Sequence, residues 1–85
     1  MEVGQLDIWK VEYSRMYGDI ATTSTKVFNG KESAKKEFED IISDILSGIS
    51  DMEDYTVDKK EYSFYLYRDG FENEDNYNVI FKRLE

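Results

Sequence analysis

The residues of this chain that are able to do chemistry are mainly carboxylates. The sequence of 85 residues holds 19 Asp and Glu against 11 Lys and Arg, and it contains no His, Cys or Pro. Without His or Cys, the chain has neither an ordinary zinc site nor a nucleophile of the thiolate or imidazole-activated type. Catalysis would depend on Asp, Glu, Lys, Tyr or Ser alone, so we expect a protein that is not an enzyme and needs no cofactor.

The carboxylates are concentrated in two stretches that hold no Lys or Arg. The first runs from residue 37 to 58 and the second from 69 to 81, whereas lysines gather at 31–36 and 59–60. The net charge of −8 opposes contact with phosphate groups, so we expect a basic protein partner and no direct binding to nucleic acid or membrane. The candidate partner-binding residues are Glu37, Asp40, Asp44, Asp51, Glu53, Asp54, Asp69, Glu72, Glu74 and Asp75.

Calcium binding is the one metal chemistry that the second stretch suggests, because calcium prefers carboxylate oxygens as ligands. The spacing of Asp69, Glu72, Glu74 and Asp75 does not follow the EF-hand pattern, and the glycine position of that loop is not filled. We therefore expect no metal site.

An amphipathic helix must position the first stretch. Asn29 or Gly30 is the expected N-cap, and Glu32 stands where a capping box would place it. Gly48 is the expected end, with continuation to about Asp54 as the alternative. The apolar residues between these ends recur at intervals of three and four, which is typical of one buried stripe: Ala34, Phe38, Ile41, Ile42, Ile45, Leu46 and Ile49.

Three of the candidate carboxylates form a row on this helix. Because Glu37, Asp40 and Asp44 are spaced by three and four residues, we expect them to share the face opposite the isoleucines, about 5–6 Å apart. Like charges at this spacing lower helix stability by roughly a few tenths of a kcal/mol per pair. Two interpretations stay open: a solvated face of an acidic protein, or a binding surface that imitates the phosphates of a nucleic acid.

Strands are expected on both sides of the helix, because apolar and polar residues alternate there with a period of two. The order ββαββ predicts a single α+β domain over residues 1–85, in which two hairpins form an antiparallel sheet and the helix packs on one face. The expected strands cover residues 6–17, 20–28, 56–68 and 77–84, with a turn at Gly18–Asp19 and a polar loop at 69–76.

Aromatic side chains are expected on the sheet face away from the helix, where we place Tyr65, Tyr67 and Tyr77. Such a face is able to stack on single-stranded bases, but the negative charge argues against that use. Core packing or a hydrophobic protein interface is the better interpretation. A homodimer joined through this aromatic face is one alternative.

In kind, the chain resembles the small acidic proteins that phages and mobile elements direct against host defence, including DNA mimics and anti-CRISPR proteins. The residues that carry the resemblance are Glu37, Asp40, Asp44, Asp51, Glu53 and Asp54, together with the stretch from Asp69 to Asp75. The resemblance implies a non-catalytic inhibitor that occupies the basic nucleic-acid-binding groove of a host nuclease, for instance a CRISPR effector. An immunity or antitoxin-like protein that neutralises a basic toxin is the second interpretation.

No segment suggests export or a membrane. Residues 1–5 lack the basic and apolar regions of a signal peptide, and no apolar run approaches the roughly 20 residues of a transmembrane helix. We therefore expect a soluble protein of the cytoplasm, which is the host-cell cytoplasm if a phage encodes it.

Overall fold

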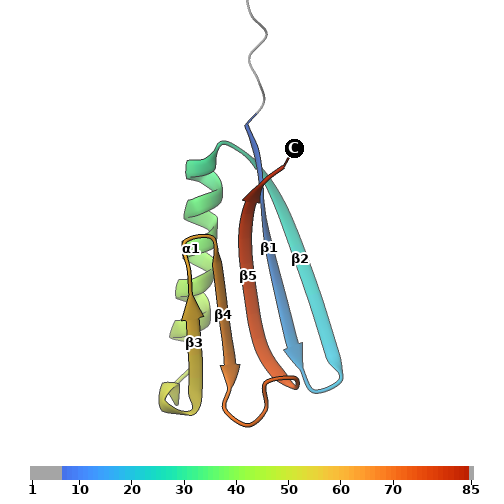
Figure 1. Ribbon diagram of the computed structural model, residues 1–85, viewed down its shortest axis with the longest axis vertical. Helices are drawn as coiled ribbons and strands as arrows, with labels where there is room; N and C mark the ends of the chain where they lie inside the picture. Colours follow the sequence, from blue (N-terminus) through green and yellow to red (C-terminus); the bar gives the residue numbers. More distant parts are fainter. Residues whose placement is uncertain (1–6, 85) are drawn as a thin grey trace, which may run out of the picture.

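A long β-hairpin opens the part of the chain that the structure, a computed structural model, describes: residues 7–84. β1 covers Ile8–Tyr17 and pairs antiparallel with β2, which covers Ile20–Asn29 (Figure 1). The strands predicted over 6–17 and 20–28 are thereby confirmed, although the first predicted residue lies outside the described ones.

The turn of this hairpin is as short as predicted. Only Gly18 and Asp19 lie between Tyr17 and Ile20, which pair with each other. Gly18 has a φ of 62°, whereas Asp19 does not have a positive φ. Glycine alone at the first central position is the mark of a type II′ turn, whose twist matches that of the two strands.

Helix α1 covers Lys31–Ser47, in agreement with the predicted amphipathic helix. The predicted capping box between Asn29 and Glu32 is wrong. Asn29 is the last residue of β2, the N-cap is Gly30, and no side chain caps the helix by a hydrogen bond. Gly30 has a φ of 113°, a backbone conformation that glycine adopts without steric cost.

The helix ends at the predicted glycine. The Gly48 amide donates to the carbonyls of Asp44 and Ile45, 3.2 Å away in each case, and so closes the last turn. The alternative in which the helix continues to residue 54 is wrong, because the next helical turn is a separate 3-10 segment, η1, at Met52–Asp54. Glycine, serine and aspartate in this stretch are poor helix formers, which accounts for the break.

Three strands follow the helix where the sequence predicted two. β3 covers Tyr55–Lys59, β4 covers Ser63–Arg68 and β5 covers Asp75–Arg83. The single strand predicted over 56–68 is therefore a hairpin, closed by the Lys60 amide, which donates to the Ser63 carbonyl at 2.8 Å. Lysine, glutamate and tyrosine at this turn are not typical turn residues, so the sequence gives no sign of the break.

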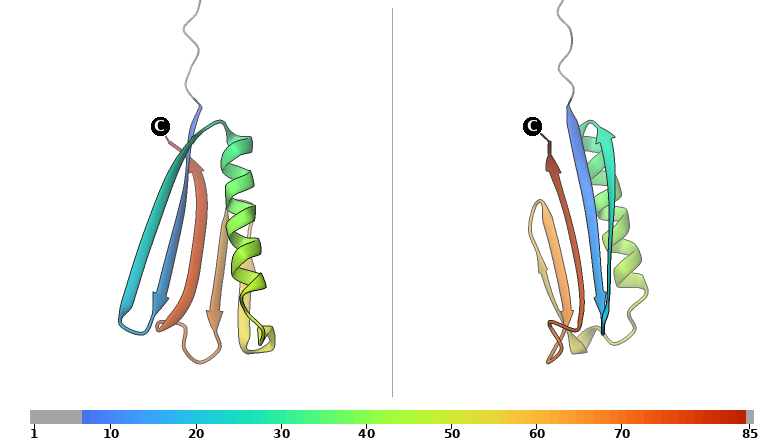
Figure 2. Two further views of the ribbon diagram at one scale, coloured as in Figure 1. Left: turned by 180° about the vertical axis from the view of Figure 1, so that it is seen from behind. Right: turned by 90° about the vertical axis from the view of Figure 1, so that its right-hand side faces the viewer.

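The five strands form one antiparallel sheet in the order β2-β1-β5-β4-β3. The last strand therefore lies in the middle and joins the first hairpin to the second. Figure 2 shows α1 against one face of the sheet, while no described element covers the other face. The predicted α+β class, with an antiparallel sheet and a helix on one face, is confirmed.

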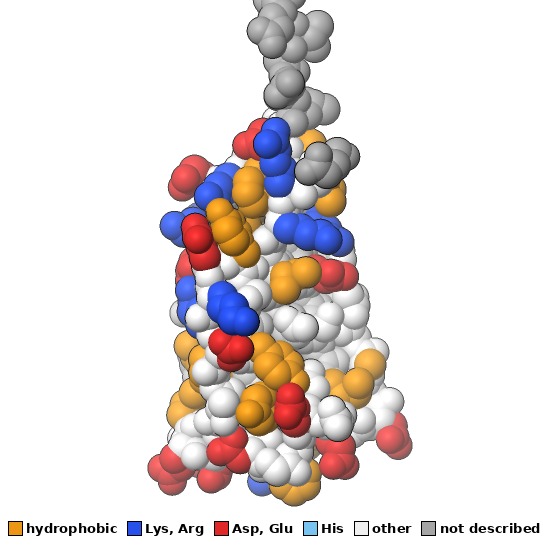
Figure 3. Space-filling model, viewed as in Figure 1, with side chains coloured by type: hydrophobic (Ala, Val, Ile, Leu, Met, Phe, Trp, Pro, Cys, Tyr) orange, Lys and Arg blue, Asp and Glu red, His pale blue; other side chains and the backbone are white. Residues whose placement is uncertain are grey.

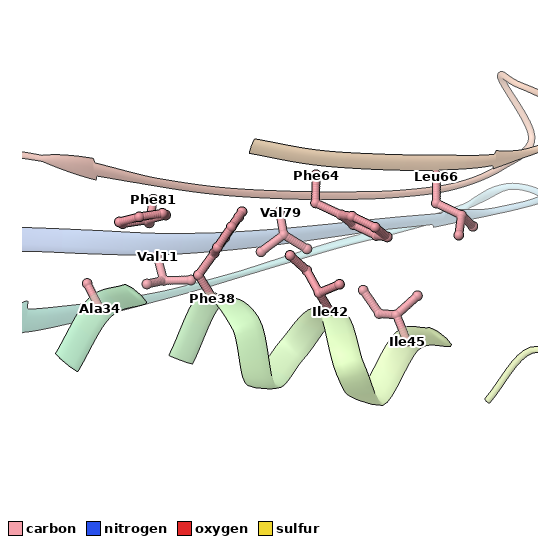
Figure 4. Close-up of a cluster of buried hydrophobic side chains, with 9 residues drawn as sticks. All are labelled: Val11, Ala34, Phe38, Ile42, Ile45, Phe64, Leu66, Val79 and Phe81. Carbon is pink, nitrogen blue, oxygen red and sulfur yellow. The ribbon is translucent and has the colours of Figure 1, made fainter. Parts of the chain in front are cut away.

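The core lies between α1 and the middle of the sheet (Figure 4). Phe38 is the largest helix side chain in it, is fully buried and packs with its ring centroid 4.7 Å from that of Phe81 on β5. The buried apolar residues come from α1 and from strands β1, β4 and β5: Val11, Ala34, Phe38, Ile42, Ile45, Phe64, Leu66, Val79 and Phe81.

Replacing Phe38 with alanine is expected to lower the free energy of unfolding by about 3–5 kcal/mol, because it leaves a cavity at the centre of this core. The matched control is Phe71→Ala, the same chemical change at a side chain that is 47% exposed, which should cost less than about 0.5 kcal/mol. Urea denaturation measures both. Equal losses in the two variants would contradict this assignment of the core.

Candidate functional site

Lysines neutralise two of the three carboxylates in the predicted helix row. Glu37 Oε2 lies 2.9 Å from Nζ of Lys26 on β2, and Asp40 Oδ2 lies 2.9 Å from Nζ of Lys36, one turn earlier on α1. Both ion pairs are at the surface, where such pairs contribute little to stability but do cancel charge. The row is therefore less acidic than its sequence suggests.

Two members of the row lie beside an isoleucine rather than opposite the isoleucines. Glu37 and Asp44 lie at the flank of α1 that faces β1 and β2, where each lines a surface hollow together with Ile41. On the other flank, Glu39 forms an ion pair with Lys59 of β3 at 3.5 Å. Of the three predicted row members, only Asp44 makes no ion pair among the described residues.

The hollow beside Asp44 is open, with a volume of about 280 Å³. Tyr13 and Tyr77 form its wall on the sheet side, and Ile41 and Ile45 form its wall on the helix side. Partial burial, together with the neighbouring Tyr77, raises the pKa of the Tyr13 phenol, so the phenol is neutral at physiological pH. The side-chain polar groups of the hollow are the Asp44 carboxylate and the hydroxyls of Tyr13 and Tyr77.

The remaining carboxylates gather at one end of the molecule, which we call the acidic end. Three connections meet there: the β1–β2 turn, the segment between α1 and β3, and the β4–β5 loop (Figure 1). Backbone hydrogen bonds join them, from Gly18 to Glu74 at 2.7 Å and from Asp69 to Asp54 at 2.9 Å. The acidic end comprises the carboxylates of Asp19, Asp51, Glu53, Asp54, Asp69, Glu72 and Glu74.

None of these carboxylates has a Lys or Arg nitrogen of the described residues within 4.0 Å. Asp69 accepts a hydrogen bond from the Thr56 hydroxyl, and Glu72 accepts one from the Tyr65 hydroxyl at 3.3 Å. Partial burial and the Glu72 carboxylate raise the pKa of the Tyr65 phenol, which keeps that donor protonated. Figure 3 shows the acidic side chains spread over this end, with most of the basic side chains toward the opposite end.

Asp75 differs from its neighbours because it is buried, with 7% of its surface exposed. Its Oδ1 lies 2.9 Å from Nη1 of Arg15 on β1, and the Arg15 guanidinium stacks over the Tyr77 ring at 3.9 Å. Arg15 also donates to the Asn76 carbonyl at 3.2 Å. The predicted site residue Asp75 is therefore buried and holds the β4–β5 loop against β1.

Exposed apolar side chains lie among the carboxylates. Tyr17 and Ile20, which flank the β1–β2 turn, are 63% and 64% exposed, and Phe71 in the β4–β5 loop is 47% exposed. The Arg68 guanidinium lies over the Phe71 ring, with its Cζ 5.1 Å from the ring centroid. Protein interfaces commonly combine exposed apolar side chains of this kind with polar and charged ones. The sequence alone does not reveal these residues or Asp19, because only the sheet topology brings the first turn next to the β4–β5 loop.

No protein-family model matches this chain, and neither a curated protein nor a solved structure matches it.

The aromatic face predicted on the sheet is smaller than expected. Tyr65 and Tyr67 lie on the uncovered face, with ring centroids 5.5 Å apart. Tyr77 alternates with the buried Val79 and Phe81, so it lies on the face that α1 covers and packs against the core. Two tyrosines among strands rich in Thr, Ser and Asn do not make an extended apolar surface.

The described residues include no metal-binding cluster and no helix that could cross a membrane. Within residues 7–84, no three Asp or Glu side chains are grouped so as to hold a metal ion. In the same part of the chain, no helix has the length and apolar character needed to cross a bilayer.

Replacing Asp75 with asparagine is expected to lower the free energy of unfolding by about 1–3 kcal/mol, because the mostly buried Arg15 guanidinium loses its charged partner. The β4–β5 loop should loosen, so that hydrogen exchange of the Gly18 amide becomes faster. Glu74→Gln makes the same chemical change at an exposed neighbour. It should change the free energy of unfolding by less than about 0.5 kcal/mol and leave the exchange rate of the Gly18 amide unchanged. If the two variants behave alike in denaturation and exchange, Asp75 has no such role.

Proposed function

We propose that this protein is a non-catalytic binding protein whose acidic end docks on a basic surface of another protein. The observation that carries the proposal is the convergence of three connections, joined by backbone hydrogen bonds, which present carboxylates without cationic partners around exposed apolar side chains. The carboxylates steer a basic partner and form charge-assisted hydrogen bonds with its Lys and Arg side chains.

The exposed apolar residues add binding free energy that the charges alone do not supply. Tyr17, Ile20 and Phe71 expose large side chains that a partner is able to bury, and aromatic anchors of this kind provide much of the binding free energy of protein interfaces. The rim of carboxylates raises the association rate and selects against acidic partners. The helix row, in which lysines neutralise two of the three carboxylates, is not needed in this arrangement.

A partner that binds nucleic acid fits this surface best. Basic surfaces broad enough to oppose three acidic connections are typical of proteins whose Lys and Arg side chains contact phosphates. We therefore propose that the acidic end takes the place of nucleic acid on such a protein, with a host nuclease of the CRISPR-effector kind as the favoured partner. The proposed place of action is the cytoplasm. A basic toxin, neutralised by an immunity or antitoxin-like protein, is the second candidate, because the same charges oppose it.

Reversing one charge on each connection should abolish this contact. The acidic-end variant carries three substitutions: Asp19→Lys, Glu53→Lys and Glu74→Lys. The replaced side chains are exposed and make no hydrogen bond or ion pair among the described residues, so the fold should be retained. The wild-type chain, immobilised and exposed to lysate of the cells that carry its gene, should retain a basic protein, identified by mass spectrometry. The variant should bind this protein at least about tenfold more weakly, equivalent to 1.4 kcal/mol.

The matched control reverses Glu32, Asp40 and Glu61, which lie away from the acidic end, and it carries the same net charge as the acidic-end variant. We expect it to bind like the wild type. If the partner binds nucleic acid, duplex DNA or RNA added to the lysate should displace it from the chain. A partner that is displaced by salt but not by nucleic acid favours the toxin interpretation. Equal binding by the two variants would rule out the acidic end as the contact surface.

A further inference from the structure

β2 forms one edge of the sheet, and almost all of it is exposed to solvent. All ten of its residues pair with β1 in a continuous register, without a bulge, and no described element pairs with its other side. Because Tyr17 and Ile20 close a two-residue turn, their backbone groups bond to each other, and alternate residues from Ile20 onward bond to β1. The residues between them direct their N–H and C=O groups to the open edge: Ala21, Thr23, Thr25 and Val27.

This edge lacks the features that keep exposed strands from pairing. Proteins protect long edges with charged side chains, proline, bulges or a covering element. The one charged residue of β2, Lys26, is bound to Glu37 of the helix. The opposite edge, β3, is only five residues long and carries Asp58 and Lys59. The long, regular and almost uncharged edge of β2 is therefore suited to receive another strand.

The charges of the molecule favour a second copy of the same chain as that strand. Residues 20–31 contain no carboxylate, although the net charge of the chain is −8. Along β2, the acidic end lies at Ile20, and the opposite end, where Lys31 begins α1, is rich in lysine and arginine (Figures 1 and 3). If two copies lie side by side with antiparallel β2 strands, the acidic end of each lies beside the basic end of the other.

We propose that two copies pair through their β2 strands, antiparallel and about a two-fold axis at Thr25, so that one sheet continues through both. In this register Thr25 lies opposite Thr25 of the second copy, Lys26 lies opposite Ser24, and Asp19 lies alongside Lys31. Val27, which is 60% exposed, lies opposite Thr23. The pairing places no like charges opposite each other and satisfies the open backbone groups of both edges.

This dimer is distinct from one joined through the aromatic sheet face, and it does not rest on the proposed function. The two-fold axis leaves both α1 helices on the same side of the sheet and places the two acidic ends at opposite ends of the assembly. Asp19 and Ile20 take part in both contacts, whereas Thr25, at the centre of the pairing, lies outside the acidic end. Thr25→Pro should therefore abolish the pairing and leave binding at the acidic end intact.

Sedimentation velocity over a range of concentrations tests the pairing. The wild-type chain should sediment as a species of about twice its mass of 10.1 kDa, at concentrations where Thr25→Pro is a monomer. Proline at residue 25 removes an outward N–H and leaves the bonds to β1 in place. The matched control, Val57→Pro, removes an outward N–H from the other edge, β3, and should remain a dimer. Circular dichroism confirms that both variants are folded.

A charge exchange at the axis shows whether the partner is a second copy in this register. Thr25→Lys alone and Thr25→Glu alone place like charges opposite each other and should each shift the equilibrium toward monomer. Mixing the two variants should restore the dimer, because lysine then lies opposite glutamate. The proposal is overturned by a wild-type chain that stays monomeric at all concentrations, by a dimer that persists in Thr25→Pro, or by a mixture no more dimeric than its components.

Discussion

The pairing of β1 with β5 is the interaction on which the rest of the structure depends. These strands lie more than fifty residues apart in the sequence, yet they pair from Trp9 and Arg83 to Tyr17 and Asp75. This pairing inserts the last strand between the two hairpins and completes the surface on which α1 packs. It also brings the β1–β2 turn against the β4–β5 loop, where the Gly18 amide meets the Glu74 carbonyl. Without it, the carboxylates of the acidic end would not be neighbours.

The same topology divides the carboxylates into two groups with different surroundings. On the two flanks of α1, Glu37 and Glu39 lie near lysines from β2 and β3 that cancel their charge locally. The carboxylates on the connections extend beyond the ends of the strands, where the described residues offer them few cations. The negative charge of the chain is therefore concentrated at one end, so the charge of the molecule is distributed unevenly along the strand direction. This uneven charge distribution underlies both proposals, because it selects a basic partner at the acidic end and favours antiparallel pairing of two copies.

Local patterns in the sequence predicted the helix and most of the strands. Features that depend on which strands pair with each other were not predictable. The stripe from Ala34 to Ile45 predicted α1, because a helix buries residues at a spacing that the sequence itself displays. Alternation predicted the first hairpin, but the turn at 60–62 lacks glycine, proline and asparagine and was not recognisable. The ion pair of Glu37 with Lys26 depends on which strand lies beside α1, so it was not predictable, whereas the pair of Lys36 with Asp40 follows from a local spacing of four residues. Glu53 and Glu74 were identified as site residues from composition, whereas Asp19 and Phe71 required the fold.

A map of where a basic ligand contacts the chain shows whether the acidic end is its binding surface. Amide chemical shifts recorded during titration with a nona-arginine peptide report that contact residue by residue. We expect the shifts to concentrate at Asp19, at residues 51–54 and at residues 69–74, to weaken as salt is added, and to leave the amides around Asp40 unchanged. Shifts centred on the helix row, or spread evenly over all exposed carboxylates, would contradict this expectation.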